Sequence, residues 1–182
     1  MKIFVDHTLS LRTVTVEDTE AVFALTDASR NTLREWLPWL DMTTEVPHTR
    51  AFIESNIAGY EERKCLSTVV LFHGKIVGIA GFNNINHANE TVYIGYWLSK
   101  DAEGHGIMTK VVHALCQYAF EELQFNKVEI RAAVGNTKSR AIPERLGFVK
   151  EGTIRSAEWL YDHFVDHGVY GMLANEWTKT SL

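Results

Sequence analysis

The sequence predicts a mixed α/β fold, and three features of its residue pattern support that fold class. Residues 91–98 carry apolar side chains at every second position, which is the period of a strand with two distinct faces. Residues 108–123 repeat their apolar side chains at steps of three and four, which is typical of one helix face. Two β-rich runs on either side of His73-Gly74 indicate a hairpin. Strands and helices therefore share one chain, as in a mixed α/β domain.

Length and composition favour one globular domain that spans residues 1–182. Of the 182 residues, 46% are hydrophobic and 23% are charged, which is ordinary for a protein with a substantial core. The formal net charge of -5 argues against a free-standing nucleic-acid binder and suits a basic substrate. The N-terminus lacks the apolar core of a signal peptide, and no apolar run approaches the ~20 residues of a membrane span. We therefore expect a cytoplasmic protein that does not bind a membrane.

The first half of the chain is expected to contain a short strand, two helices and a hairpin. The predicted elements are a strand at 9–14, a helix at 15–29, a helix at 49–63, hairpin strands at 67–72 and 75–82, and a polar loop at 83–89. Between the two helices, Trp36 and Trp39 flank Pro38 in an apolar segment, and the proline forces a break or a new helix start. These tryptophans either pack in the core or form one wall of a substrate pocket.

The second half is expected to alternate strands and helices. The predicted elements are a strand at 91–98, a helix through 108–124, a strand at 127–134, a short helix at 136–146, and closing strands at 148–154 and 168–173. Gly147 is placed as the stop signal of the short helix.

A glycine turn, Glu103-Gly104-His105-Gly106, lies between the strand at 91–98 and the helix that follows. The first turn of a helix leaves several backbone N–H groups without an intrahelical partner, and together with the helix dipole these groups bind anions, phosphates especially. The turn is either a plain tight turn or a pyrophosphate cradle. It has neither the Gly-Lys-Ser/Thr ending of a nucleoside-triphosphate loop nor the third glycine of a dinucleotide fold.

Two segments together resemble the GNAT superfamily of N-acetyltransferases. Residues 103–108 are similar to its acetyl-CoA motif, Gln/Arg-x-x-Gly-x-Gly/Ala, although Glu103 replaces Gln/Arg and Met108 replaces Gly/Ala. Residues 134–148 resemble the Asn-x-x-Ser…Gly-Phe segment of the same superfamily, especially of its bacterial ribosomal-protein N-acetyltransferase branch, with Asn136, Ser139 and Gly147 at the matching positions. The resemblance extends over most of the chain, including the tryptophan-rich segment.

The resemblance implies a single GNAT domain with a mostly antiparallel central sheet, one splayed parallel strand pair and flanking helices. In that family the pantetheine arm of acetyl-CoA lies between the two splayed strands, which here would end near Leu98 and Val134. The implied binding residues for the cosubstrate are Trp97, Leu98, Glu103, Gly104, His105, Gly106, Ile107, Met108, Thr109, Asn136 and Ser139. We expect Glu103 to face solvent or to pair with Lys100 or Lys110, because a carboxylate aimed at pyrophosphate would repel it. Lys138 either meets the phosphates of the cosubstrate or is a solvated lysine.

The resemblance also suggests catalytic roles. Glu158 lies in a segment where some of these enzymes carry a general base, and partial burial beside Trp159 would make its carboxylate a stronger base. The alternative is an exposed strand carboxylate. Ser139 is placed to protonate the departing thiolate, or it merely contributes to the cap of the helix that Asn136 starts. Asn136 would hold the cosubstrate or acceptor through its amide, and a backbone N–H of Trp97 or Leu98 would polarise the thioester carbonyl.

The acceptor is the least defined partner. The predicted function is transfer of the acetyl group to an amine by direct attack in a ternary complex, with Trp36, Trp39 and Tyr96 lining the acceptor pocket. The branch favours the N-terminal amine of a ribosomal protein. Alternatives are a small amine, such as a polyamine or an amine antibiotic, or a non-catalytic module that binds or senses CoA. A homodimer is implied by resemblance only.

No metal site is predicted from the sequence. Asp162, His163, Asp166 and His167 are expected in a hairpin loop rather than on a ligand-bearing helix. The two cysteines, Cys65 and Cys116, lack metal-ligand spacing and are expected to be reduced, buried thiols.

Overall fold

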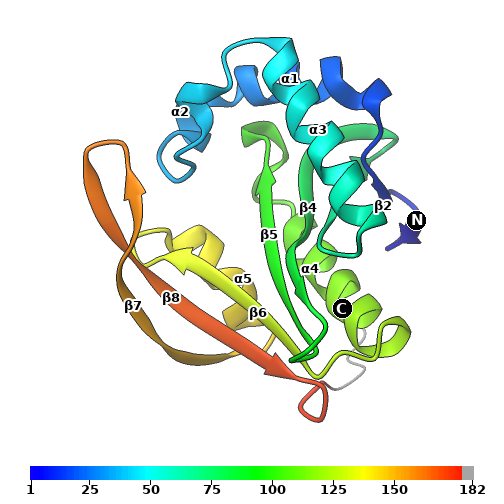
Figure 1. Ribbon diagram of the computed structural model, residues 1–182, viewed down its shortest axis with the longest axis vertical. Helices are drawn as coiled ribbons and strands as arrows, with labels where there is room; N and C mark the ends of the chain where they lie inside the picture. The colour runs from blue at the N-terminus through cyan, green and yellow to red at the C-terminus, as the bar shows by residue number, and fades with distance from the viewer. Residues whose placement is uncertain (178–182) are drawn as a thin grey trace.

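A computed structural model describes residues 1–177 and shows one twisted eight-stranded sheet with helices on both faces (Figure 1). The strand order is β1-β2-β3-β4-β5-β6-β8-β7, and every neighbouring pair is antiparallel except β5 and β6, which are parallel. The strands are β1 (Lys2–Phe4), β2 (Leu9–Thr13), β3 (Leu66–Phe72), β4 (Lys75–Asn86), β5 (Thr91–Leu98), β6 (Lys127–Ala133), β7 (Val149–Leu160) and β8 (His163–Leu173). The mixed α/β class and the mostly antiparallel sheet with one parallel pair are confirmed.

The α-helices also follow the predicted order. They are α1 (Thr19–Ala28), α2 (Arg30–Leu33), α3 (Val46–Glu61), α4 (Ile107–Gln117) and α5 (Thr137–Arg145). A single π-helical turn, Tyr118–Glu122, continues α4. Short 3₁₀ turns cover Val16–Asp18, Leu40–Met42 and Lys100–Ala102. In the tryptophan-rich segment, α2 lies before Pro38 and a 3₁₀ turn lies after it, because a proline interrupts a helix.

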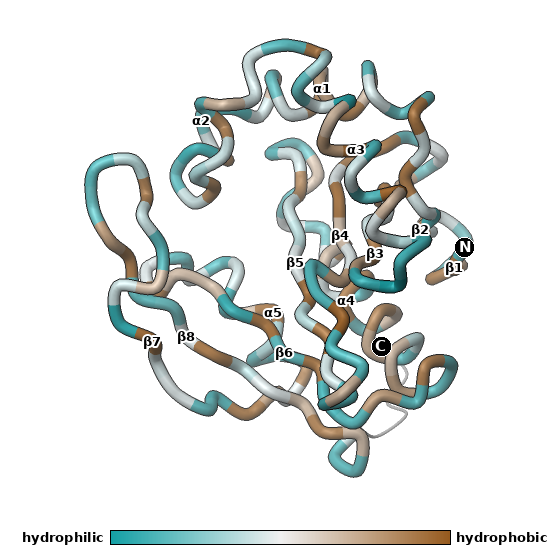
Figure 2. The backbone as a smooth tube through the Cα atoms, in the orientation of Figure 1, coloured by the Kyte–Doolittle hydropathy of each residue, from teal (hydrophilic) through white to brown (hydrophobic). Residues whose placement is uncertain are grey.

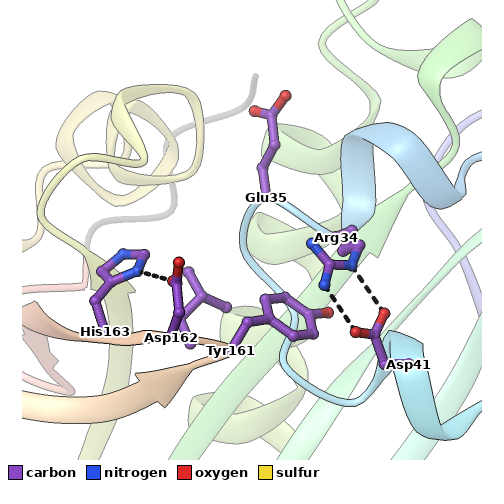
Figure 3. A pocket seen from close by; sticks show the side chains of 7 residues that line it. Arg34, Glu35, Asp41, Tyr161, Asp162 and His163 are labelled. Atoms are coloured by element: carbon purple, nitrogen blue, oxygen red, sulfur yellow. Dashed lines mark hydrogen bonds and ion pairs between the residues drawn. The ribbon is translucent and has the colours of Figure 1, made fainter.

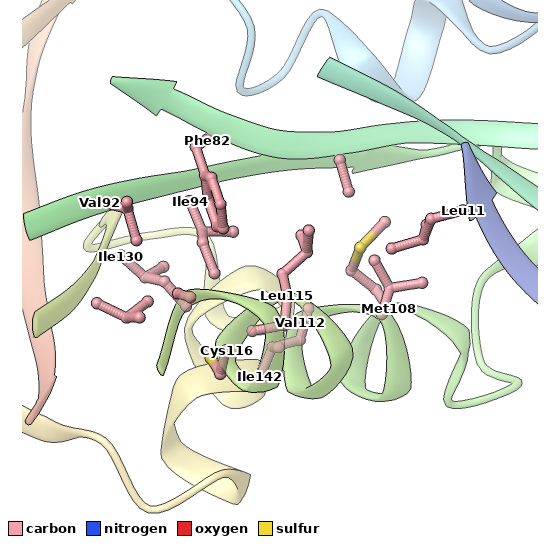
Figure 4. Close-up of a cluster of buried hydrophobic side chains, with 14 of the residues drawn as sticks. Leu11, Phe82, Val92, Ile94, Met108, Val112, Leu115, Cys116, Ile130 and Ile142 are labelled. Carbon is pink, nitrogen blue, oxygen red and sulfur yellow. The ribbon is translucent and has the colours of Figure 1, made fainter. Parts of the chain in front are cut away.

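The main core lies between α4 and the sheet (Figure 4). The helix stripe at Met108, Val111, Val112, Leu115 and Ala119 is buried as predicted. It packs on the apolar face of the central strands, whose largest fully buried members include Phe82, Val92 and Ile130. One expected member of the stripe, Leu123, is 37% exposed because the π-helical turn shifts the register at the end of α4.

The opposite face of the sheet is covered by α1 and α3, which pack around Val14, Val22, Ile53, Val69 and Ile79. Trp97 joins this second cluster, whereas Tyr96 and Leu98 pack against the first. The alternation predicted for residues 91–98 is therefore confirmed, with one set of side chains on each face.

Several predicted boundaries are wrong. β4 continues through Asn86, so residues 83–86 are strand rather than loop. β7 and β8 form a hairpin whose tip is Tyr161-Asp162, so Asp166 and His167 lie on a strand and not in a loop. The edge strand β1 was not expected. In Figure 2 the turns at the lower edge of the sheet are hydrophilic, while hydrophobic residues lie along the strands.

Both cysteines are free in the structure, as expected. Cys116 is buried in the main core, whereas Cys65 is only half-buried; burial raises the pKa of each thiol. No helix within residues 1–177 is long and apolar enough to cross a membrane.

Candidate active site

The parallel strands β5 and β6 separate partway along their length. They pair from Thr91↔Lys127 to Ile94↔Ile130 and not beyond. Past that point β5 stays on β4 as far as Leu98, and β6 stays on β8 as far as Ala133. The two strands diverge toward their C-terminal ends in Figure 1. The splayed pair that the sequence implied is confirmed, and it leaves the backbone N–H and C=O groups of Tyr96 and Leu98 available on the side that faces β6.

The strand geometry separates the two candidate backbone donors, Trp97 and Leu98. The N–H of Ser99 donates to Val77 O at 2.8 Å, and a Cβ built on Gly78 would lie 2.3 Å from Trp97 O. Both contacts show that the backbone N–H of Ser99 and the backbone C=O of Trp97 point toward β4. Because successive residues of a strand point their backbone groups to opposite sides, Leu98 directs its N–H into the opening between β5 and β6.

A polar side chain that the sequence reasoning missed lies where the opening begins. Asn83 is the extra residue of a β-bulge in β4, and its amide lies so close to Gly95 that a Cβ there would be 2.2 Å from Asn83 Nδ2. Gly95 is therefore required for close approach. The change from the apolar run that ends at Phe82 to the asparagines that follow it was the signal that could have identified it.

The glycine turn forms the N-terminus of α4. Gly106 is the N-cap in the left-handed region, with φ 70°, and Gly104 has φ 80°. Among the described residues, none accepts a hydrogen bond from the N–H groups of residues 104–109, and the first bond of the helix is Lys110 N–H to Gly106 O at 3.2 Å. A Cβ on either glycine would meet no heavy atom within 4 Å, so the backbone conformation and not lack of space explains the glycines. This open row of donors fits an anion.

The start of α5 closes the opening on the side of the main core. Asn136 caps α5, since its Oδ1 accepts the Ser139 N–H at 3.0 Å. The Tyr96 hydroxyl donates to Ser139 O at 2.9 Å, and Ser139 Oγ donates to Tyr96 Oη at 3.3 Å. Burial raises the pKa of Tyr96 to about 12, so its hydroxyl keeps its proton at neutral pH. The alternative role considered for Ser139, a part in the cap of the helix that Asn136 starts, is thus present in the structure through its backbone N–H.

Two cations from α5 reach the glycine turn. Lys138 Nζ lies 2.7 Å from Glu103 Oε2, and Arg145 Nη1 donates to Thr109 Oγ1 at 2.6 Å. Glu103 was expected to face solvent or to pair with Lys100 or Lys110. Its partner is Lys138 instead, and Lys110 pairs with Asp6 at 2.8 Å. Arg145 was not foreseen, because nothing in local sequence places the last turn of α5 beside the first turn of α4.

Glu158 lies on β7, and its carboxylate faces the His167 side chain of β8. Its Oε2 is 3.3 Å from His167 Nε2, and the Glu158 side chain is 33% exposed. Trp159 does not bury it, contrary to expectation: adjacent strand residues point to opposite faces, and Trp159 packs edge-to-face on Phe164 instead. A β-bulge between Ile154 and Glu158 aligns Glu158 with Val165, which places its carboxylate beside His167.

Beside the opening, the sheet therefore carries a histidine–carboxylate pair on one face and two hydroxyl groups on the other. His167 is opposite Ala133 in the β6–β8 register, and Ala133 shares its face with Glu129 and Arg131. Tyr96 and Ser139 lie on the opposite face, with the main core and α5. A molecule in the opening would have Glu158–His167 on one side and Tyr96–Ser139 on the other.

The tryptophan-rich segment lies close to the end of β6 and to the tip of the β7–β8 hairpin. The ring of Trp36 lies 3.3 Å from a Cβ built on Gly135, just past the end of β6, whereas Trp39 is 37% exposed. The β7–β8 tip docks on this segment, because Tyr161 Oη donates to Leu37 O at 2.5 Å. Figure 3 shows the resulting cavity, which has a volume of about 470 Å³. It is lined by Arg34, Glu35, Asp41, Leu160, Tyr161, Asp162 and His163.

The four acidic and histidine residues considered for a metal are dispersed. Asp162 and His163 pair at the hairpin tip at 2.6 Å, while Asp166 accepts the Ser156 N–H at 2.7 Å. Within residues 1–177, no group of three or more His, Cys, Asp or Glu side chains is arranged to hold a metal ion.

The geometry suits an extended ligand that carries amide groups and a diphosphate. A gap between parallel strands with free backbone groups suits an amide-containing arm, and the helix N-terminus at the same end suits its diphosphate. Residues 8–149 match the family model of the acetyltransferase (GNAT) domain, so the chain belongs to this acetyltransferase family.

Individual relatives agree with the family. The Bacillus subtilis (strain 168) protein YdaF, whose name as a ribosomal N-acetyltransferase is itself provisional, is 33% identical over 174 residues, covering 95% of each chain. RimL, a ribosomal L7/L12 α-N-protein acetyltransferase solved with coenzyme A, has a TM-score of 0.93 at 27% identity and covers 97% of this chain and 99% of its own. The microcin C7 self-immunity acetyltransferase MccE, solved with acetyl-CoA and AMP, has a TM-score of 0.89 at 28% identity, covering 93% and 94%. The chain is an acetyl-CoA-dependent N-acetyltransferase of this family.

Proposed function

We propose that this enzyme acetylates the N-terminal amine of a ribosomal protein by direct attack within a ternary complex. One observation carries the catalytic part of the proposal: beyond the β5–β6 opening, the Glu158 carboxylate and His167 lie on one face of the sheet, and the hydroxyls of Tyr96 and Ser139 lie on the other. Direct transfer needs a proton acceptor on the side of the amine and a proton donor on the side of the leaving group. The similarity to RimL over nearly the whole chain supports the peptide acceptor.

On the acceptor side, Glu158 is the proposed general base. An α-amino group has a reference pKa of ~8, so near neutral pH most of it carries the extra proton that blocks attack. The Glu158 carboxylate takes that proton. His167, with Nε2 at 3.3 Å, holds the carboxylate in place, and the bulge in β7 fixes the position of both groups. His167 is thus a positioning residue, and Glu158 is the catalytic one.

On the donor side, acetyl-CoA supplies a thioester carbonyl and a thiolate leaving group. The Leu98 N–H points into the opening and is the proposed donor to the carbonyl oxygen, in preference to Trp97. The Ser139 hydroxyl, linked to the Tyr96 hydroxyl at 3.3 Å, is the proposed proton source for the thiolate. Asn136 contributes by fixing the first turn of α5 through its cap. Cys116 is not proposed to take up the acetyl group as a covalent nucleophile, because it is buried in the core.

The acceptor is proposed to lie between Trp36 and the β7–β8 tip. Glu35 and Asp162 line the cavity there, and Asp162 is 87% exposed, so a cationic amine meets favourable charge before it loses its proton. The same acidic lining supports a second candidate, a small polyamine or an amine antibiotic. The similarity of this chain to the self-immunity acetyltransferase MccE is the reason to test small amines beside peptides.

The experiment is a competition among acceptors. The enzyme with acetyl-CoA would be given synthetic peptides with free or blocked N-termini, polyamines and amine antibiotics, and free thiol would be measured over time. The proposal predicts turnover with the free peptide and none with the blocked peptide. Turnover confined to the small amines would replace it with the second candidate. Acetyl-CoA binding without turnover on any amine would support a CoA-sensing module.

Three further expectations belong to this proposal. Residues 1–182 would form one domain, and the enzyme would act in the cytoplasm, where ribosomal proteins are made. A homodimer would use the outer edge of β7, which pairs with no other strand among residues 1–177, because such an edge can accept a strand of a second copy. Light scattering of the purified protein measures that state directly.

A further inference from the structure

The most informative feature outside the reacting centre is a pair of cations that α5 directs at the glycine turn. Lys138 and Arg145 are seven positions apart, which is about two helical turns, so they lie on one face of α5. Each contacts a different side of the turn: Lys138 reaches Glu103 just before the glycines, and Arg145 reaches Thr109 just after them. The two cations therefore flank the unpaired N–H groups of residues 104–109.

Glu103 explains why such a pair is needed. It places a carboxylate, 34% exposed, immediately before the open row of donors, where a diphosphate would be repelled by it. The contact with Lys138 neutralises that charge, and Glu103 in turn raises the pKa of Lys138. Because the Lys138 side chain is 82% exposed and its stem is flexible, its ammonium is free to shift from the carboxylate to a phosphate oxygen.

We propose that Lys138 and Arg145 form a clamp for the diphosphate of acetyl-CoA, with Glu103 holding Lys138 in place when the cosubstrate is absent. The inference rests on the proposed use of acetyl-CoA and adds specific side chains of α5 to its recognition. Arg145 contributes a planar fork that can bond a phosphate while it keeps its contact to Thr109, whereas Lys138 contributes a mobile point charge. Glu103 competes with the phosphates for Lys138 and so weakens binding.

Calorimetric titration of the full chain with acetyl-CoA, at low and moderate salt, tests the clamp. Lys138→Gln and Arg145→Gln are each expected to weaken binding about tenfold and to flatten its salt dependence, since each removes a charged contact. Glu103→Gln is expected to strengthen binding about threefold, because Lys138 loses its competitor. Lys110→Gln is the matched control: it lies in the first turn of α4, but its ammonium is held by Asp6, so affinity stays unchanged.

Two further measurements keep the outcome decisive. Arg145→Lys retains the charge without the fork and is expected to recover part of the affinity that Arg145→Gln loses, which separates charge from loss of folding. Repeating the titrations with dephospho-CoA, which lacks the 3′-phosphate, should leave the losses intact; losses that disappear would place the cations on the 3′-phosphate and overturn the diphosphate clamp. Unchanged affinity in both glutamine variants would also overturn it. If the unaltered protein failed to bind acetyl-CoA, the proposed function would fail instead.

Discussion

Replacing Glu158 with Gln tests the proposed base while keeping the size of the side chain. A positioned general base contributes about 10²–10⁴-fold to a rate. Glu158 is one-third exposed and has a single described side-chain partner, His167, so water can partly replace its function. We therefore expect the lower end of that range, a fall in kcat of about 100-fold, which corresponds to about 2.7 kcal/mol in the activation free energy.

The assay is thiol release at saturating acetyl-CoA, with the affinity for acetyl-CoA measured separately by calorimetry. Affinity should be unchanged, because Glu158 lies on the face of the sheet opposite to α5 and the glycine turn. In the variant, the rate should also rise with pH toward the acceptor's own pKa of ~8, since only the already neutral amine can react. Glu151→Gln is the control, because it makes the same change on the same strand but pairs with Lys127. A kcat for the Glu158 variant within about twofold of that of the control would refute the assignment.

Three other predictions concern stability and binding. Because the pKa of Tyr96 is raised to about 12, its contribution to the free energy of unfolding is present below pH ~10 and lost as pH rises from about 10 to 12; urea denaturation across this range should show a fall that Tyr96→Phe abolishes. Asp18 is buried and accepts two hydrogen bonds from Arg12 at 2.6 and 2.7 Å, so Asp18→Asn should cost about 3 kcal/mol in denaturant titrations, against less than about 1 kcal/mol for the exposed Asp27→Asn. Gly106→Val should destabilise the fold by about 2 kcal/mol and weaken acetyl-CoA binding, because a β-branched residue is strained at φ 70°; affinity equal to that of the unaltered protein would argue against the cradle.

The parts of the fold that could be predicted are those in which burial imposes a period. β5 was predicted with its observed bounds, Thr91–Leu98, because its two faces pack in two different cores. α4 was predicted from an apolar stripe that the sheet buries. In both elements a whole face is buried, so the apolar residues recur with the period of the strand or helix in the local sequence.

The boundaries that were predicted wrongly lie in segments where burial imposes no period on the sequence. β7 is an exposed edge strand, so its side chains carry no alternation. Its bulge has Ser156 and the turn after it has Tyr161 at positive φ, in place of glycine. The end of β4 carries three asparagines around a single core-packed side chain, Ile85, although the backbone of residues 84–86 still pairs with β5. Hydrogen bonding of the backbone sustains these strands without a sequence signal.

The candidate site was predictable as a set of motifs and not as a set of contacts. The motif placed Gly106, Ser139 and Glu158 in the site but did not show that Glu158 faces His167 or that Glu103 faces Lys138. Both pairs depend on strand register and on the packing of α5 against α4, which join residues far apart in the chain. Such juxtapositions follow only from the folded structure.

The central claim is direct acetyl transfer across the opening between β5 and β6. The most direct test mixes the enzyme with one equivalent of acetyl-CoA, first alone and then with a peptide bearing a free N-terminus, and follows both chains by mass spectrometry. The account predicts no acetylated enzyme and no free thiol before the peptide is added, followed by one acetyl group on the peptide's α-amine. An acetylated enzyme formed before the peptide is added, or an acetyl group found only on a side-chain amine, would contradict it.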